Sequence, residues 1–340
     1  MTMTRRINLA LQGGGAHGAF TWGALDRLLE EPEIEIAAIS GTSAGALNAA
    51  VLKAGLVTGG PKGARAALAA LWDAVGDAGD FRLMPWMRAW WPYMADVSAI
   101  AENLMPVSPA GLTAQLVSPY ALDGYWTNPL ADIVTGFDFD AITSAEGPRL
   151  SIGATNVRTG KSHIFTGSHV SADAILASAC LPTVFRAVSI GGEEYWDGGY
   201  SGNPSLWPLY NADLPEDIVI IQVNPLRREA LPMTPVEIQD RISEIGFNSA
   251  LLGEMRAIRF VKRLIAEGRI ERGTMKDIRL HVISDDKLMN SLSGSTKMLP
   301  SPALLDRLRA AGRVAADDFI TCHRHRIGNE SSVELTDLLG

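Results

Sequence analysis

The segment that most constrains the fold is the apolar run 36–40 followed at once by Gly41-Thr42-Ser43-Ala44-Gly45. A β-prone run that stops at G-x-S-x-G and passes directly into a helix-prone run has the strand–elbow–helix order in which the serine becomes a nucleophile. Because the turn is tight, a side chain at Gly41 or Gly45 would collide with the neighbouring strand or helix. Ser43 would then lie at a helix N-terminus, where free N–H groups favour developing negative charge.

The chain before this elbow has the same strand–loop–helix order. Ile7–Leu11 reads as a buried first strand, and it runs through the glycine-rich segment Gly13–Gly18 into an amphipathic helix, Ala19–Leu29. Glu33–Ser40 reads as the second strand, which delivers the elbow. This order predicts an α/β fold with a parallel sheet, helices on its faces, and functional loops at the carboxyl ends of the strands.

The glycine-rich segment has two interpretations. Gly13, Gly15 and Gly18 fit the G-x-G-x-x-G loop of a nucleotide-binding oxidoreductase, but that loop needs an acidic residue at the end of the second strand, and Glu33 and Glu35 lie at its beginning. In the other interpretation, the backbone N–H groups of residues 13–15 form an oxyanion hole. The elbow at the adjacent strand end favours this second interpretation, in which the protein catalyses acyl transfer.

Two later segments extend the pattern. Ala177–Phe185 reads A-S-x-x-x-P-x-x-F, and the strand-like residues Glu194–Trp196 lead into Asp197-Gly198-Gly199, with Asn203-Pro204 shortly after. Together with the glycine-rich segment and the elbow, these segments, in this order, resemble the patatin-like phospholipase family. One position departs from that pattern: His17 stands where the family commonly has Arg or Lys, and we expect it to be a partly exposed loop residue.

The resemblance implies a three-layer sandwich around a central, mostly parallel sheet, and a lipid or other ester as substrate. It implies a dyad in which Ser43 is the nucleophile and Asp197 the general base. The expected oxyanion loop is Gly13, Gly14 and Gly15, and the expected supporting residues are Gly198, Gly199 and Asn203, the last fixing the loop that aims Asp197.

Serine nucleophiles more often use histidine as the base. The histidines that follow the acid in the chain are His281, His323 and His325. None of them lies in a glycine-cornered loop, and the resemblance to the patatin-like family instead implies the carboxylate of Asp197 as the base. A non-catalytic lipid-binding relative with the same fold remains an alternative.

We expect residues 1–340 to form one domain, with a catalytic core at about 5–225 and a helical extension at about 230–330 packed on that core. Residues 80–127 lack the strand–helix alternation and carry many aromatic residues, so they read as an insertion. Its aromatic side chains could cap an acyl-chain pocket or contact a bilayer interface, or they could pack into the body of the protein.

Charge and composition limit the partners. The chain has 30 basic and 38 acidic residues, a net charge of −8, which argues against nucleic acid as a partner. Cys180 and Cys322 lack metal-ligand spacing and are expected to be small core residues, and no metal or cofactor is expected. The sequence shows neither a secretory segment nor a transmembrane run, so we expect a cytoplasmic protein, with transient peripheral membrane contact left open.

Overall fold

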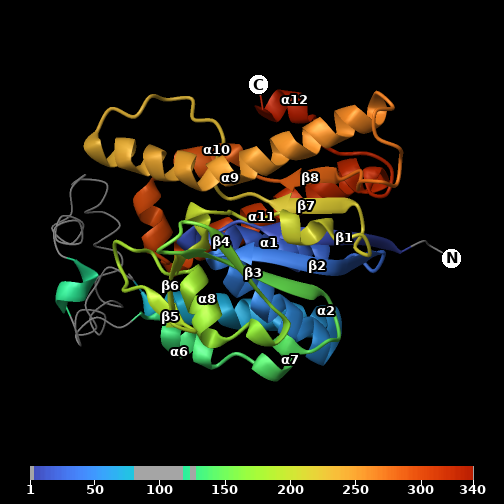
Figure 1. Ribbon diagram of the computed structural model, residues 1–340. Coiled ribbons are helices and arrows are strands. Elements are labelled where there is room, and N and C mark those ends of the chain that lie inside the picture. Colours follow the sequence, from blue (N-terminus) through green and yellow to red (C-terminus); the bar gives the residue numbers. More distant parts are fainter. Residues whose placement is uncertain (1–3, 80–117, 123–127, 340) are drawn as a thin grey trace.

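A computed structural model describes residues 4–79, 118–122 and 128–339 of the chain. In this part of the chain, a single eight-stranded sheet runs through the centre of the molecule, in the order β5-β6-β3-β2-β1-β7-β8 with β4 paired to β3 (Figure 1). The strands are β1 (Arg5–Leu11), β2 (Ile34–Thr42), β3 (Arg149–Asn156), β4 (Ser162–Thr166), β5 (Val188–Ile190), β6 (Glu193–Asp197), β7 (Asp217–Ile221) and β8 (Arg279–Ile283).

The sheet is mostly parallel. Strands β3, β2, β1, β7 and β8 pair in parallel, whereas β4, β5 and β6 form the antiparallel part. The expected α/β class with a central, mostly parallel sheet is therefore confirmed.

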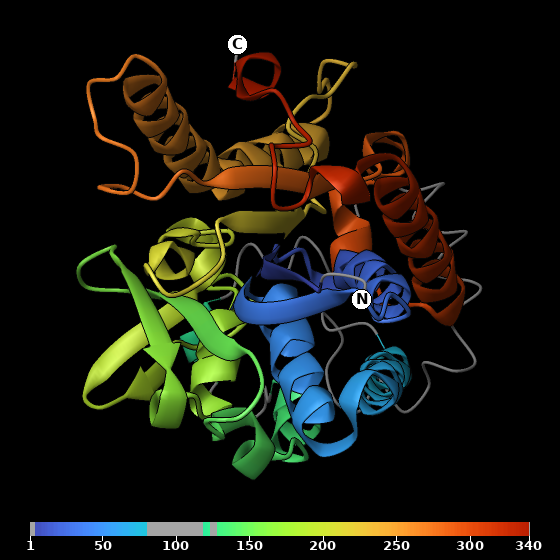
Figure 2. The same cartoon turned by 90° about the vertical axis from the view of Figure 1, so that its right-hand side faces the viewer.

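Helices cover both faces of the sheet. The described α-helices are α1 (Gly18–Leu28), α2 (Ala44–Ala78), α6 (Leu130–Thr135), α7 (Phe139–Thr143), α8 (Ala172–Ser178), α9 (Pro235–Ala266), α10 (Asp286–Ser291), α11 (Pro302–His323) and α12 (Leu335–Leu339). Figure 2 shows α1, α2 and α11 on one side of the sheet, while α9 and α12 lie on the other.

Strand β7 shows why the central strands are almost uninterruptedly apolar. Its side chains alternate, so that Val219 and Ile221 pack into the core under α1 and α11, and Ile218 and Ile220 pack into the core under α9. A strand covered by helices on both faces has no solvent side for polar residues.

The break between the two helices after the elbow is shorter than expected. The sequence predicts a helix ending near Gly55, a loop at 59–63 and a second helix from Ala64; in the structure α2 consists of two helices that meet at a kink at Gly60, the one residue with non-helical φ and ψ. Pro61 follows, and proline fits the first position of a helix because no N–H is needed there. The predicted loop is therefore wrong, since the break takes one residue.

The apolar residues of helix α9 that belong to the hydrophobic core lie in its second half. Leu251, Met255 and Ile258 are buried against the sheet, whereas Ile242 and Ile245 in the first half are exposed. None of the described helices is long and apolar enough to cross a membrane.

Two further expectations concern single segments. Cys180 is buried as expected, but Cys322 is exposed near the end of α11, so its assignment to the core was wrong. Most of the predicted aromatic insertion at 80–127 lies outside the described residues.

Candidate active site

The elbow places Ser43 in a backbone conformation that side chains rarely adopt. Ser43 is the N-cap of α2 with φ 56° and ψ −124°, and it is the only non-glycine residue with a positive φ in the described chain. The predicted crowding is confirmed, because a Cβ on Gly41 would lie 2.4 Å from the Gly45 carbonyl oxygen and a Cβ on Gly45 2.1 Å from that of Leu11. Such strain persists only where the surrounding structure imposes it, and it clusters at functional sites.

Strand register brings Asp197 to this serine. Thr42, the last residue of β2, pairs with Gly153 of β3, and Asp197, the last residue of β6, pairs with the next residue, Ala154. Strands β2 and β6 flank β3, and the residue after β6 approaches the end of β2, since a Cβ on Gly198 would lie 2.9 Å from Thr42 Cγ2. Ser43 and Asp197, 154 positions apart in the chain, therefore lie at neighbouring strand ends.

The Asp197 carboxyl group is buried, with 1% of its surface exposed. Its Oδ1 accepts a hydrogen bond from the Gly199 N–H at 2.7 Å, while Oδ2 has no hydrogen-bond partner of ordinary geometry among the described residues. Burial raises the pKa of Asp197 to about 7, against the opposing effects of the Gly199 N–H and the Ser43 hydroxyl, which favour the charged form. A carboxyl group with a pKa near neutrality, and with one oxygen that no ordinary hydrogen bond occupies, is suited to proton transfer at physiological pH.

The glycine loop differs from the expectation in one donor. The Gly13 N–H, expected in the oxyanion hole, donates instead to Asn203 Oδ1 at 2.6 Å. The N–H groups of Gly14 and Gly15 donate to no acceptor within the described residues, and Gly15 has φ +57°. Two backbone donors rather than three are therefore available in this loop.

Asn203 joins the glycine loop to the segment that follows Asp197. Its side chain contacts both polar groups of Gly13, since Oδ1 accepts from the N–H and Nδ2 donates to the carbonyl oxygen at 3.3 Å. These bonds hold the glycine loop, and the expectation that Asn203 also fixes the loop carrying Asp197 stays a prediction. The Asp197 loop is held by its own Gly199 N–H and by the close approach of Gly198 to Gly153.

A small apolar cavity of about 80 Å³ adjoins Ser43, Gly14 and Gly15. Its walls otherwise consist of Lys297 and of mainly hydrocarbon and aromatic residues, among them Leu47, Trp72, Leu181, Phe185, Phe247 and Met298. A lining of this kind accommodates an alkyl chain better than a polar or charged group.

The predicted exposure of His17 is wrong. The residue is 2% exposed, because the 3₁₀ segment η6 (Gly294–Met298) covers it and Thr296 Oγ1 lies 2.7 Å from its Nε2. Burial, together with the nearby charges of Lys297 and Arg228, holds the pKa of His17 well below its usual value, so the ring is neutral.

The histidines considered as alternative bases lie in other surroundings. His281 is fully buried in β8, and its Nε2 lies 3.0 Å from Oδ1 of Asp217, the first residue of β7. The elbow follows the last residue of β2, at the opposite, carboxyl end of the parallel strands. The His323 ring packs on Phe319, which also contacts His281.

Ser178 is a contributor for which the sequence analysis assigned no role. Its Oγ accepts the Ser43 N–H at 2.9 Å and donates to the Gly153 carbonyl at 2.6 Å, so it ties the elbow to β3. The only sequence signal was its place in the A-S-x-x-x-P-x-x-F segment.

We expect Ser178→Ala to lower kcat about tenfold, because a lost hydrogen bond of roughly 1.4 kcal/mol releases the strained serine backbone. Ser171→Ala is the matched control: its Oγ accepts the Ala174 N–H at 3.2 Å as the N-cap of α8. That change should cost about 1 kcal/mol in the free energy of unfolding and leave kcat unaltered. Equal kcat values for the two variants would contradict the assignment of Ser178.

The fold and the site define the class: an α/β protein with a serine elbow and a buried carboxyl group at the carboxyl edge of its sheet. The chain belongs to the patatin-like phospholipase family, whose model matches residues 9–210. Membership of this family supports an esterase- or lipase-type hydrolase that acts on lipid esters.

Solved structures that resemble the chain do so at low identity. VipD from Legionella pneumophila is 15% identical with a TM-score of 0.43, over 94% of this chain and 67% of that one. ExoU in its complex with SpcU, from the type III secretion system of Pseudomonas aeruginosa, is 18% identical with a TM-score of 0.33. That likeness covers 94% of this chain and 53% of the other, so the chain spans about half of that relative's length. No curated protein matches the chain.

Proposed function

We propose that this chain is a lipid acyl hydrolase of the phospholipase A or lysophospholipase type, which cleaves carboxylic esters through an acyl-enzyme on Ser43. The observation that carries the proposal is the buried Asp197 carboxyl group, whose Oδ2 no ordinary hydrogen bond occupies, close to the hydroxyl of a strained serine. The family match and the apolar cavity support a lipid as the source of the ester.

In the first half of the reaction, Ser43 Oγ attacks the ester carbonyl carbon while Asp197 Oδ2 takes the hydroxyl proton. The carbonyl oxygen becomes an oxyanion, and the Gly14 and Gly15 N–H groups donate to it. Collapse of the tetrahedral intermediate breaks the ester C–O bond, and Asp197 returns its proton to the departing alkoxide. The product alcohol leaves, and the acyl group stays on Ser43.

In the second half, Asp197 takes a proton from water, and the resulting hydroxide attacks the acyl-enzyme carbonyl. The same two N–H groups hold the second oxyanion. Its collapse releases the fatty acid and returns the proton from Asp197 to Ser43. A carboxyl group with an ordinary pKa near 3.8 would be a weak base for this chemistry, so the raised pKa of Asp197 supports its role.

A fluorophosphonate probe tests the nucleophile. We expect a covalent adduct on the tryptic peptide that contains Ser43, found by mass spectrometry, and fatty-acid release when purified protein meets a panel of phospholipids, lysophospholipids and glycerides. Heat-denatured protein is the control for non-specific labelling. Lipid binding without either adduct or fatty-acid release would favour the non-catalytic alternative.

The alternative function, a nucleotide-binding oxidoreductase, can be tested separately. A Cβ on Gly13 would lie 2.5 Å from the Ser43 Cβ, so the elbow fills the space beside the glycine loop where an adenosine would enter. Thermal stabilisation by nicotinamide cofactors, together with no fluorophosphonate adduct, would support an oxidoreductase instead.

A further inference from the structure

The peptide bond between Gly13 and Gly14 carries two groups that point in opposite directions, because the bond is planar and trans. One is the N–H of Gly14, a residue that lines the cavity beside Ser43, and this N–H belongs to the proposed oxyanion hole. The other is the Gly13 carbonyl, which accepts hydrogen bonds from Asn224 Nδ2 at 2.7 Å and from Asn203 Nδ2 at 3.3 Å. Whatever holds or polarises this carbonyl therefore acts on the N–H across the same peptide unit.

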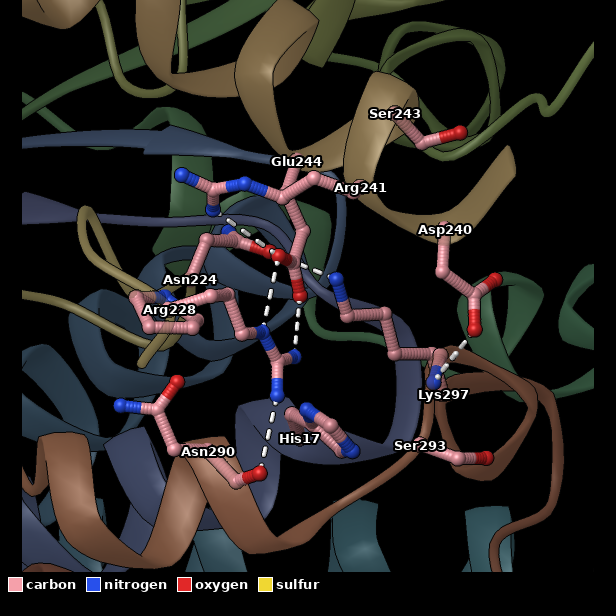
Figure 3. Close-up of polar contacts among 12 residues, drawn as sticks. His17, Asn224, Arg228, Asp240, Arg241, Ser243, Glu244, Asn290, Ser293 and Lys297 are labelled. Atoms are coloured by element: carbon pink, nitrogen blue, oxygen red, sulfur yellow. Dashed lines mark hydrogen bonds and ion pairs between the residues drawn. The ribbon is translucent and has the colours of Figure 1, made fainter. Parts of the chain in front are cut away.

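Asn224 links this carbonyl to a cation. It is fully buried, three residues after β7, and its Oδ1 accepts a hydrogen bond from Lys297 Nζ at 2.8 Å (Figure 3). Lys297 comes from η6, and its backbone carbonyl also packs on Gly15, where a Cβ would lie 2.2 Å from the oxygen. Both ends of the proposed oxyanion loop are thus in contact with segments after residue 220.

Acidic groups balance the charge of the half-buried Lys297 ammonium. Burial lowers the pKa of Lys297, whereas the nearby carboxylates of Glu244 and Asp240 oppose that effect and favour the charged form. Glu244 is 1% exposed and pairs with Arg228 and Arg241, so it is held in place from several sides. The neutral His17 ring lies below this cluster in Figure 3 and adds no charge to it.

We propose that Lys297 and Asn224 are positioning residues that strengthen the oxyanion hole through the Gly13–Gly14 peptide. The ammonium polarises the Asn224 amide, which becomes a stronger donor to the Gly13 carbonyl. That hydrogen bond polarises the peptide, so the Gly14 N–H becomes a stronger donor to the oxyanion. The two asparagines also hold the peptide plane, so the N–H keeps its direction toward the cavity.

This proposal rests on the proposed serine mechanism and extends it beyond the part of the chain that the family model matches. Residues 9–210 contain Ser43, Asp197 and the glycine loop, but neither Asn224 nor Lys297. The second half of the chain is therefore expected to be needed for full catalysis in addition to covering the sheet.

Substitution of Lys297 by an uncharged side chain of similar length tests the electrostatic link. We expect Lys297→Met to lower kcat about tenfold with little change in KM, because the effect falls on the oxyanion and not on the bound ester. Lys297→Arg should recover most of the lost kcat. The rate of phosphonylation of Ser43 by a fluorophosphonate should fall by the same factor, since that reaction also develops charge on an oxygen in the hole.

The matched control is Lys276→Met. Lys276 is a half-buried lysine that donates to the carbonyls of Leu209 and Asn211 and has no contact with Asn224 or the glycine loop among the described hydrogen bonds. Its replacement should leave kcat unchanged. A loss of kcat as large as that of Lys297→Met would show that removing any such lysine disturbs the fold, and it would overturn the proposal.

Asn224→Asp provides a second variant that keeps a partner for Lys297 and removes the donor to the Gly13 carbonyl. We expect at least a tenfold loss of kcat, and the further change Lys297→Met in this background should add little, because the cation acts through the amide. Strictly additive losses, or losses in KM alone, would overturn the relay. If Ser43→Ala is inactive while folded Lys297→Met keeps full kcat, the relay fails and the serine mechanism stands; if Ser43→Ala stays active, the mechanism itself fails.

Discussion

Ser43→Gly is expected to abolish ester turnover and at the same time to stabilise the protein. Loss of the nucleophile should lower kcat by on the order of 10⁴-fold or more. A residue with a side chain loses about 1–3 kcal/mol of stability in the positive-φ conformation of Ser43, and glycine has no such penalty. Glycine also makes the unfolded chain more flexible, which destabilises the folded state by roughly 0.5–1 kcal/mol. We therefore expect a net gain of about 1 kcal/mol in the free energy of unfolding.

Ser43→Ala separates the two effects. Alanine also removes the hydroxyl, so turnover should fall as far, but it keeps the Cβ and with it the strained backbone. Urea denaturation of the three proteins should therefore place Ser43→Ala close to the wild type and Ser43→Gly above both. A Ser43→Gly protein less stable than Ser43→Ala would show that the elbow carries no strain, and substantial turnover in either variant would remove Ser43 as the nucleophile.

The parts of the site that could be predicted lie in short segments, where residues close together in the sequence determine which side chains fit. The elbow could be read from Gly41 and Gly45 because a tight turn excludes side chains within a few residues of Ser43. The position of Asp197 followed from a family resemblance, and its closeness to Ser43 follows from the register of β2 and β6 on β3.

What could not be predicted depends on contacts between distant parts of the chain. His17 is buried because η6, about 280 residues later in the chain, covers it. No residue near position 17 in the sequence predicts this burial. Asn203 turned out to hold Gly13, and Asn224 and Lys297 meet the same loop from elements that the motifs do not mention. Their side chains are ordinary polar residues in the sequence, and only the fold makes them neighbours.

The burial of Asp197 sets a cost that stability measurements can detect. The rise of its pKa from the usual 3.8 to about 7 means that folding destabilises the charged carboxylate, relative to the protonated form, by about 4 kcal/mol. The carboxyl group is therefore expected to be a stability liability at the pH at which it serves as a base. Proteins tolerate such groups where their chemistry is needed.

Asp197→Asn should accordingly lower kcat by about 10³-fold and raise the free energy of unfolding at pH 8 by up to about 4 kcal/mol. The amide cannot accept the serine proton, but its oxygen can still accept the Gly199 N–H that Oδ1 now accepts. A wild-type profile of kcat/KM against pH should rise with a midpoint near 7, since only the ionised carboxylate is a base.

The pH dependence of stability provides the sharper comparison, because the folded pKa is raised. Above pH 7 the carboxyl is ionised in both the folded and the unfolded wild type, so the full cost of burial is present and the Asn variant gains most. As the pH falls through 7, the folded wild type takes up a proton and the cost declines, until below about pH 4 both states are protonated and the two proteins should be equally stable. Denaturation curves at pH 4, 6 and 8 measure this difference directly. A constant difference across that range would show that burial does not raise the pKa of Asp197 in the folded protein. A variant that keeps turnover would show that Asp197 is not the base for Ser43.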